Sequence, residues 1–417
     1  MPNKVDYPDI LTGKIQQGPY PMEKVKRVDE ITTRIVGDIK RIDVRKTGFA
    51  MAASGAFGAT AQREFMRHGP KFPITYAQMK EVGPIFNQVA DGPIAPNEAP
   101  LPPEPDILSR HIKSLGYYLG ADVAGICRLP QWAVFSHNHE GKPIELNHQF
   151  AIVYVVDMSY ETMLGSTGDD WISASESFHG YSSSAHIACL VASYIRQLGY
   201  PARAHFQGGM MANYQVPLTP LTLLSGIGEL SRAGWALNPF IGGRFKGAVV
   251  STDLPLAVDK PIDFGLQEFC RVCKKCAINC PSKAISMDDE KIEHNGYMAW
   301  GFDFERCTKY RVMNQNGSSC GRCVKYCPWN KPRGWTHDAV RWFVRKAPFL
   351  DSLLLKGNEV FGYEKQDIRY KWWLDLENVD GLIRIPPKSR DNTLWALKES
   401  PAPPLPGQGP PSGKPTS

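Results

Sequence analysis

The amino-acid sequence predicts an α+β protein in which a compact, cysteine-rich segment is inserted after a region of mixed helices and strands. The run FAIVYVVDM, which starts at Phe150, is uninterrupted, apolar and rich in strand-forming residues, and it indicates a buried β-strand. The stretch SSSAHIACLVASYIRQLGY has apolar residues at helical spacing and predicts an amphipathic helix closed by Gly199. Eight of the ten cysteines lie between Cys270 and Cys327, which indicates one local purpose for them.

The remaining patterns divide the chain into five sections. Residues 1–105 combine short helical patterns with a proline-rich connector, DGPIAPNEAPLPPEP, which predicts an extended linker over a surface. The stretch ILSRHIKSLGYYLGA has helical periodicity, and THDAVRWFVRKAP predicts a helix stopped by Pro348. The last residues, 398–417, are rich in proline and glycine and cannot form a core. The predicted sections are residues 1–105, 106–255, 256–335, 336–397 and 398–417.

Composition and charge exclude several classes of protein. Hydrophobic residues make up 42% of the chain and charged residues 22%, as is usual for a globular protein. The formal net charge is only +6 without a long basic run, so no nucleic-acid partner is expected. No apolar run is long enough to span a bilayer. The N-terminal residues lack a twin-arginine pair and an apolar signal segment, so the sequence as written predicts a cytoplasmic protein. A mature export product with a new start methionine would look the same, so membrane association or export stays an alternative.

Eight cysteines form two related runs, whereas Cys127 and Cys189 lie in apolar patterns and are predicted to be buried structural residues. The first run, from Cys270 to Cys280, has the spacing C-x2-C-x2-C-x3-C-P that ligates iron–sulfur cubanes. The second, CGRCVKYCP, repeats C-x2-C-x3-C-P and is preceded by Cys307. In two-cluster ferredoxin modules the fourth cysteine of each run crosses to the other cluster, which predicts two [4Fe-4S] clusters here. The first would be held by Cys270, Cys273, Cys276 and Cys327, and the second by Cys307, Cys320, Cys323 and Cys280.

Two features of these runs leave alternatives. Two zinc sites of four thiolates each would use the same residue type, but zinc ribbons usually pair two C-x2-C knuckles and rarely add a third cysteine and an x3-C-P ending. Twelve residues, TKYRVMNQNGSS, separate Cys307 from Cys320, where a plain bacterial ferredoxin has two. We expect this insertion to be a loop beside the clusters, with a turn at Asn316 and Gly317. Such a loop is either a binding element or a solvated insertion.

Beyond the cysteines, the sequence resembles the reductive dehalogenases, which are corrinoid and iron–sulfur enzymes that remove halogen from organic substrates. The resemblance rests on LPLAVDKPIDFGLQEFCRVCKKCAINCPSKAI and on two upstream stretches, GIGELSRAGWALNPFIGGRFKGAVVSTDLPL and SESFHGYSSSAHIACLVASYIRQLGYPA. It continues into GRCVKYCPWNK and FLDSLLL, and so covers roughly Asp106 to Gly362. Epoxyqueuosine reductases share the same corrinoid and two-cluster plan and are the nearest alternative.

The resemblance implies a nitroreductase-like core that binds cobalamin base-off, without a protein ligand below cobalt, and an inserted bacterial-ferredoxin-like module with two [4Fe-4S] clusters. The motif D-x-H-x-x-G, which supplies a lower histidine ligand in other corrinoid proteins, is absent. Asp106 and His111 are too far apart for it, and neither His137 nor His139 has an aspartate two residues earlier. The five sections then become an N-terminal region, the corrinoid-binding core, the cluster module, a C-terminal section packed on the core and a tail.

The resemblance also implies a proton donor. Replacing a carbon–halogen bond by carbon–hydrogen requires a proton, which a tyrosine donates in the family, and the matching residue is Tyr181 in SESFHGYSSS. A phenol is protonated at neutral pH, and a nearby cation stabilises the tyrosinate as it forms. Alignment on TDLPL assigns this cation to Lys246, with Arg244 as the alternative. If the segment is extended, both side chains point to the same face.

Further residues match the family more weakly. Ser177 matches a small hydroxyl residue near the corrinoid, one helical turn before the tyrosine if this stretch is helical, and Gln207 matches an amide that supports the proton donor. Gly208 and Gly209 would allow close backbone approach to a ligand. Arg311, in the insertion, stands where some relatives have an aromatic pocket residue, and it favours a polar or anionic organohalide.

The resemblance implies three kinds of partner: an organohalide substrate, an external electron donor (ferredoxin, flavodoxin or membrane reductase) and a small membrane-anchor subunit. Two other functions are alternatives. An epoxyqueuosine-type reductase acting on tRNA is disfavoured because Tyr181 stands where a carboxylic acid would be needed and no basic tail is present. A plain two-cluster electron carrier would leave most of the chain unexplained.

Overall fold

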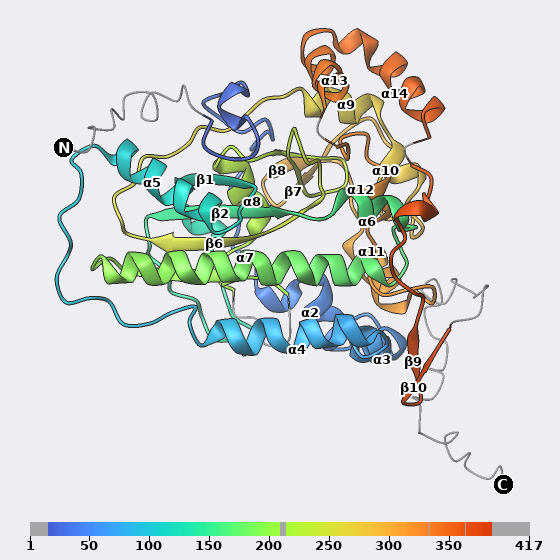
Figure 1. The fold of residues 1–417 in the computed structure, drawn as a ribbon, viewed down its shortest axis with the longest axis horizontal. Coiled ribbons are helices and arrows are strands. Elements are labelled where there is room, and N and C mark those ends of the chain that lie inside the picture. Colours follow the sequence, from blue (N-terminus) through green and yellow to red (C-terminus); the bar gives the residue numbers. More distant parts are fainter. Residues whose placement is uncertain (1–15, 209–213, 333, 363, 386–417) are drawn as a thin grey trace.

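A four-stranded antiparallel sheet with strand order β1-β2-β6-β3 forms the centre of the fold (Figure 1). Its strands are β1 (Val123–Arg128), β2 (Phe150–Asp157), β6 (Phe245–Thr252) and β3 (Ala202–Phe206). The predicted strand is confirmed, because β2 is buried along its whole length except at its last residue. The computed structural model describes residues 16–208, 214–332, 334–362 and 364–385.

Both faces of the sheet are covered, which explains why β2 is apolar throughout rather than alternating. Ile152 and Tyr154 enter one hydrophobic core, whereas Ala151 and Val153 enter the other. The helix α7 (Ile172–Gln197) runs along the first face beside β6 and packs on β6, β3 and β2 (Figure 1). The other face packs against residues from α8 (Leu218–Leu224) and from the segments that follow it.

The long helix α7 confirms the predicted amphipathic helix and extends it. It ends where expected, because Gly199 adopts a φ of +86° just beyond the last turn. It begins at Ile172, ten residues before the predicted stretch starting at Ser182. Ser177 and Tyr181 therefore lie on this helix, one turn apart.

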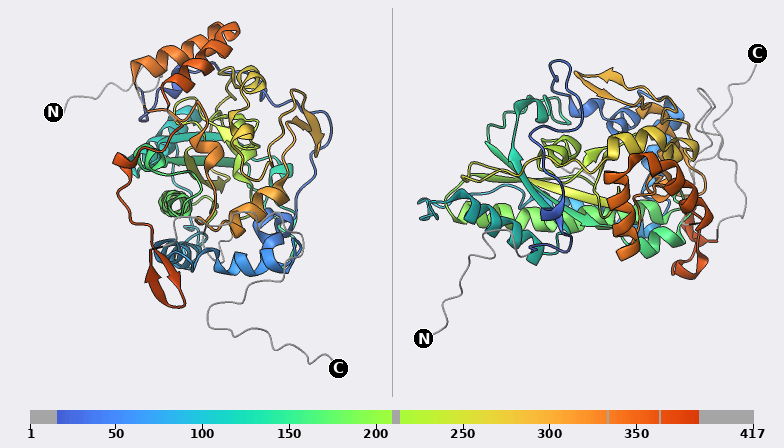
Figure 2. Two further views of the ribbon diagram at one scale, coloured as in Figure 1. Left: turned by 90° about the vertical axis from the view of Figure 1, so that its right-hand side faces the viewer. Right: turned by 90° about the horizontal axis from the view of Figure 1, so that it is seen from above.

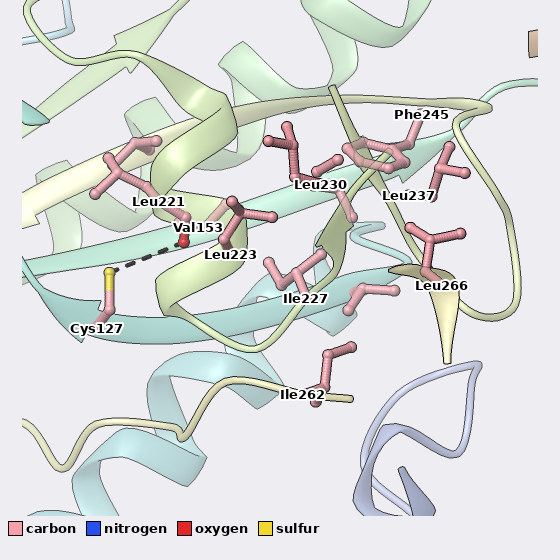
Figure 3. Packing of buried hydrophobic residues seen from close by; sticks show 14 of the residues in the cluster. Cys127, Val153, Leu221, Leu223, Ile227, Leu230, Leu237, Phe245, Ile262 and Leu266 are labelled. Carbon is pink, nitrogen blue, oxygen red and sulfur yellow. Dashed lines mark hydrogen bonds between the residues drawn. The ribbon is translucent and has the colours of Figure 1, made fainter. Parts of the chain in front are cut away.

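The two cysteines outside the runs are buried, as predicted. Cys127 Sγ lies 3.9 Å from the carbonyl oxygen of Leu221, among the apolar side chains that cover the second face of the sheet (Figure 3). Cys189 lies on α7 within the first core. The core of the second face also includes Cys270 and Cys273, so the cysteine-rich segment packs directly on the sheet layer.

The N-terminal region forms helices that pack beside α7 and the cysteine-rich segment (Figure 1). They are α2 (Gly48–Ala53), α3 (Ala59–His68) and α4 (Pro73–Asn87). Up to Glu104, the proline-rich connector has no helix or strand; it lies along the end of α7, where the Ala95 amide donates to the Arg196 carbonyl at 2.9 Å. The next predicted helix is confirmed as α5 (Pro105–Tyr118).

The cysteine-rich segment consists of short helices and one hairpin. Its elements are α9 (Leu266–Val272), α10 (Lys275–Ile278), β7 (Ile292–His294), β8 (Tyr297–Ala299), α11 (Phe304–Met313) and α12 (Arg322–Lys325). The expectation that the whole insertion after Cys307 is a loop is wrong. The helix α11, capped by the Asp303 side chain, continues through Cys307 to Met313, and only the residues from Asn314 to Ser319 form a loop.

The C-terminal section lies outside the central layers, as Figure 2 shows for the orange and red helices. The predicted helix is confirmed as α13 (Trp335–Lys346), and α14 (Asp351–Val360) follows it. Within the described ranges, no helix combines the length and the apolar composition that a membrane span needs. The remaining elements are η1 (Met22–Lys24), η2 (Val44–Lys46), η3 (Gln131–Ala133), α6 (Tyr160–Gly165), β4 (Glu229–Leu230), β5 (Ala236–Leu237), η4 (Pro348–Leu350), η5 (Ile368–Tyr370), β9 (Glu377–Val379) and β10 (Leu382–Arg384).

Candidate functional site

A cavity of about 680 Å³ lies between the sheet layer and the cysteine-rich segment. Ligand cavities typically measure roughly 300–1,000 Å³, so this one is large enough for a sizeable organic molecule. Its wall is formed by the segment before α2, one face of α7, the start of β6 and the two cysteine runs. Aromatic side chains such as Phe135, Trp235 and Trp300 contribute much of the apolar surface.

Tyr181 and Lys246 are 65 positions apart in the sequence, and both line this cavity in mutual contact. Lys246 Nζ lies 5.3 Å from the centroid of the Tyr181 ring, which is a cation–π distance. Two glycines permit this contact: a Cβ atom on Gly180 would lie 2.9 Å from Lys246, and one on Gly208 would lie 2.5 Å from the Tyr181 ring. Gly208 also has a φ of +86°, which other residues rarely adopt. The backbone at Gly180 therefore packs against the Lys246 side chain, and the backbone at Gly208 packs against the Tyr181 ring, so both side chains are held in place.

Two of the more weakly predicted residues also line the cavity. Ser177 lies one turn before Tyr181 on α7, and its hydroxyl donates to the carbonyl of Ser173 at 2.9 Å. Gln207 follows β3 and precedes the glycine that packs on the tyrosine ring. The predicted residue Gly209 lies outside the described residues.

Arg244 is not among the described residues that line the cavity, although Lys246 is. Its side chain is buried, and its Nε and Nη2 atoms donate to the two carboxylate oxygens of Asp157 at 2.7 Å each. Its Nη1 atom donates to Asn330 Oδ1 at 2.6 Å. The arginine thus joins the end of β2 to the residues that follow the second cysteine run, and its contacts are structural.

Arg311 lines the cavity from α11. Its guanidinium lies 4.2 Å from the centroid of the Phe49 ring, and its Nε donates to Ser319 Oγ at 3.4 Å. Burial, and then the positive charge of Arg311, lower the pKa of the adjacent His68 to about 3, so this histidine is neutral.

Positive charge dominates the cavity wall. Four cationic side chains line it, whereas no carboxylate is found among the described residues of its wall. One of the four is paired with the Asp169 carboxylate at 3.4 Å, behind the wall, and the other three would attract an anion. The cationic residues are Lys46, Lys246, Arg311 and Arg322.

Four of the eight clustered cysteines form a first group, which we name the distal thiol group. Burial raises the pKa of the Cys270 thiol well above its usual value, and the neighbouring Cys273, Cys276 and Cys327 raise it further. Three members come from the first run and the fourth from the end of the second run. None of the four is among the described residues that line the cavity.

The other four cysteines form the proximal thiol group. Burial raises the pKa of the Cys323 thiol well above its usual value, and Cys320, Cys307 and Cys280 add to this effect. All four of these cysteines line the cavity. Cys276 of the distal thiol group also raises the pKa of Cys323, so the two groups are adjacent.

The two groups fit four-iron clusters in chemistry and arrangement. Buried thiols with a raised pKa stay protonated alone and lose their protons when they ligate a metal. Each thiolate of such a cluster binds a different iron, so the ligands need not converge on one point. Indeed, within the described part of the chain, no three histidine, cysteine, aspartate or glutamate side chains converge to hold a single ion.

Sequence reasoning missed the contribution of the N-terminal region. Ile42, Lys46, Thr47 and Gly48 line the cavity, although the first hundred residues carried little resemblance to any pattern. The short motif KTG in this segment gave no recognisable signal, because its position depends on long-range packing.

Asp169 is a second residue that the sequence did not reveal. Its carboxylate is buried, accepts a hydrogen bond from the Tyr310 hydroxyl at 2.7 Å and lies 3.4 Å from Arg322. Its carbonyl accepts from Asn314 Nδ2 at 2.6 Å. These contacts tie the segment before α7 to the loop that carries Cys320. The acidic pair in GDDW is the only sequence signal for it.

The comparisons with known proteins agree with this geometry. Residues 269–331 match the family of 4Fe-4S dicluster domains, and this range includes all eight clustered cysteines. The tetrachloroethene reductive dehalogenase of Sulfurospirillum multivorans is 30% identical over 307 residues, which cover 64% of this chain and 60% of that protein. A tetrachloroethene reductive dehalogenase of Desulfitobacterium hafniense is 37% identical over 222 residues, or 51% of this chain and 38% of that protein.

A solved structure and a more distant relative complete the comparison. The catabolic reductive dehalogenase NpRdhA superposes with a TM-score of 0.85 at 40% identity, over 93% of this chain and 56% of that one. The epoxyqueuosine reductase of Atelocyanobacterium thalassa is 32% identical over 114 residues, or 26% of this chain and 35% of that protein. The chain is therefore similar in sequence and in fold to reductive dehalogenases. It spans 60% of the length of the Sulfurospirillum multivorans protein and 56% of the length of the solved NpRdhA structure.

Proposed function

We propose that this chain catalyses the reductive dehalogenation of an organohalide, with cobalamin and two [4Fe-4S] clusters as its cofactors. The observation that carries the proposal is that Tyr181, Lys246 and the proximal thiol group line one cavity. The similarity to named reductive dehalogenases, including a solved structure described as acting by B12-dependent dehalogenation, supports it.

The cavity fits a corrinoid between a nitroreductase-like core and a ferredoxin-like module. Ser177 and Gln207, which line the cavity, would contact it, whereas Gly208 packs on the Tyr181 ring and would hold the proton donor in place. When bound, cobalamin supplies a strongly nucleophilic, low-valent cobalt, which is the difficult part of the chemistry. The one histidine among the described residues of the wall is His294, on an exposed hairpin strand, so we propose base-off binding.

The role of the protein in the reaction is proton delivery. The reaction consumes two electrons and one proton and converts a carbon–halogen bond into a carbon–hydrogen bond and a halide ion. Tyr181 donates the proton from its hydroxyl to the carbon, and Lys246, 5.3 Å from the ring centroid, stabilises the tyrosinate that results. Solvent then reprotonates the tyrosinate.

The arrangement of the thiols gives a direction to electron delivery. The proximal thiol group lines the cavity, whereas the distal thiol group lies behind it on the side of α9. We propose that Cys270, Cys273, Cys276 and Cys327 hold the cluster that receives electrons from outside. Cys280, Cys307, Cys320 and Cys323 then hold the cluster that faces the substrate cavity.

The charge of the cavity favours an anionic organohalide. Four cations and no described carboxylate line it. The charge of Arg311 would attract an anionic substrate but would not help to bind a purely apolar one. One similar structure is a complex with 3-bromo-4-hydroxybenzoic acid, which is an anionic aromatic of this class. Arg311→Gln should raise KM for a brominated hydroxybenzoate by about tenfold and leave KM for a neutral bromophenol almost unchanged. Equal effects on both substrates would refute this role.

The experiment that tests the proposed function is anaerobic reconstitution with iron, sulfide and cobalamin, followed by assay of halide release with Ti(III) citrate as reductant. Corrinoid absorption bands together with halide release support the proposal. Corrinoid bands without halide release favour an epoxyqueuosine-type reductase, and iron–sulfur absorption alone favours a plain electron carrier.

The remaining features of the proposal concern organisation and partners. We propose that residues 106–255 form the corrinoid-binding core and residues 256–335 the cluster module. In the same proposal, residues 1–105 are an N-terminal region and residues 336–397 a C-terminal section that packs on the core; residues 398–417, predicted to be a tail, lie outside the described residues. We also propose that the protein receives electrons from an external donor and binds a membrane-anchor subunit. Its proposed location is the cytoplasm or, if exported, outside it.

A further inference from the structure

The helices α13 and α14 carry an apolar surface that no described part of the chain covers. Trp335 and Trp342 lie two turns apart on α13, and Trp335 is 81% exposed. Phe349, which is 83% exposed, precedes α14, and Leu353 and Val360 continue its line along that helix. These five residues form what we name the hairpin face. Exposed apolar surfaces of this kind mark sites of interaction rather than random exposure.

The hairpin face lies on the outer side of the distal thiol group. On the inner side of α13, Val344 packs in the same core as Cys270 and Cys273. From α14, Glu359 forms an ion pair at 3.3 Å with Lys275, which lies in the first cysteine run. Figure 1 shows α13 directly beside α9, the helix that carries the first cysteine. A protein bound to the hairpin face would therefore reach the distal thiol group before the proximal one.

The charge of the hairpin face is positive. Lys346 follows Trp342 by one turn on α13, Lys356 lies one turn after Leu353 on α14, and both lysines and Arg345 are exposed. Within the described residues, none of these three cations forms an ion pair. The exposed acidic residues of the two helices, Asp338 and Glu359, are both neutralised by ion pairs. A partner with an apolar centre and an acidic rim is complementary to this surface.

We infer that the hairpin face is the docking site of the external electron donor, and that this donor is a small, acidic, one-electron carrier protein. The inference rests on the proposed function, because only an enzyme that consumes electrons needs such a site. A second copy of the chain is a poorer occupant, since two hairpin faces would bring like charges together. The apolar residues supply contact area, and the three cations steer the acidic carrier toward the distal thiol group.

The test uses the reconstituted holoprotein and a reduced plant-type [2Fe-2S] ferredoxin as the probe. Stopped-flow spectroscopy measures the second-order rate constant of electron transfer from the ferredoxin to the protein. In Lys346→Glu/Lys356→Glu this rate constant should fall at least about tenfold at low ionic strength, and the difference should shrink at high salt. Trp342→Ala should weaken ferredoxin binding without changing the salt dependence.

The matched control is Lys24→Glu/Lys80→Glu, which makes the same change of charge on exposed lysines away from the hairpin face. Its rate constant should stay within about twofold of the unmodified protein. Equal rate constants in the two double variants would overturn the docking site. A dimer of the unmodified protein that dissociates in Trp342→Ala would also overturn it. The same holds if the hairpin variants abolish binding to anionic vesicles but leave electron transfer from ferredoxin unchanged.

A second reductant separates this inference from the proposed function. Halide release driven by Ti(III) citrate needs no docking, so it should be equal in the unmodified protein and in both double variants. If the unmodified protein releases no halide with Ti(III) citrate, the proposed function fails. If it does release halide, and the hairpin variants do not change the rate constant of electron transfer from ferredoxin, only the docking inference fails.

Discussion

Replacement of Tyr181 by phenylalanine tests the proposed proton donor directly. The change removes one hydroxyl and keeps the ring that packs on Gly208, so the fold and the cavity should be preserved. General acid catalysis contributes about 10²–10⁴-fold, which corresponds to roughly 3–5 kcal/mol of transition-state stabilisation. We expect kcat/KM for halide release to fall by this factor while iron, cobalt and the visible spectrum stay unchanged.

The distance between the two side chains sets the size of the effect at Lys246. With the tyrosinate charge placed at the ring centroid, a unit charge 5.3 Å away stabilises it by about 3 kcal/mol at an effective dielectric constant of ~20, or about two powers of ten in rate. Lys246→Gln should therefore cost about a hundredfold. The double variant with Tyr181→Phe should be little worse than the tyrosine variant alone, because the lysine acts only through the tyrosinate.

The assay follows halide release under anaerobic conditions with Ti(III) citrate and at least two organohalides, since halide departure could dominate the barrier for one of them. Tyr194→Phe is the matched control, because this tyrosine lies on the same helix and is absent from the described wall of the cavity. Full activity of Tyr181→Phe on every substrate would refute the proton-donor role. Additive losses in the double variant would refute the coupling to Lys246.

Three further predictions follow from the contacts. Cys280→Ala should disturb the proximal cluster and spare the distal one, seen as loss of one of two signals in electron paramagnetic resonance; loss of the distal signal alone would refute the crossed ligation. Gly208→Ala places a Cβ atom 2.5 Å from Tyr181 and should lower halide release about tenfold or more with unchanged cobalt content. Arg244→Gln removes the cation from the partly buried Asp157 carboxylate and should reduce the free energy of unfolding in urea by about 2–3 kcal/mol. An unchanged free energy would contradict the structural role of the arginine.

Features set by local spacing were predictable from the sequence. The two cysteine runs follow from short motifs, and the family match over residues 269–331 confirms a dicluster domain, whereas the crossed grouping of the cysteines stays a prediction. The buried strand β2 and the helices α5, α7 and α13 follow from periodicity, which depends on neighbouring residues only. Boundaries were less accurate, because the first turns of α7 carry serine residues that give no strong apolar pattern.

Features set by long-range packing were not predictable in this way. Tyr181 and Lys246 were paired only through the resemblance, since 65 residues separate them and no local pattern links them. Arg244 and Lys246 could not be ranked from the sequence, because the ion pair with Asp157 depends on how β2 and β6 align. The helical part of the insertion was not predictable, because α11 begins before Cys307 and its residues carry no strong apolar periodicity.

The most direct test of the account is the stoichiometry of halide release by the protein reconstituted with iron, sulfide and cobalamin. With a brominated hydroxybenzoate and Ti(III) citrate, we predict one bromide ion for every two electrons consumed, in a preparation that contains about eight irons and one cobalt per chain. Absence of bromide release from a preparation with this full cofactor content would contradict the proposed function.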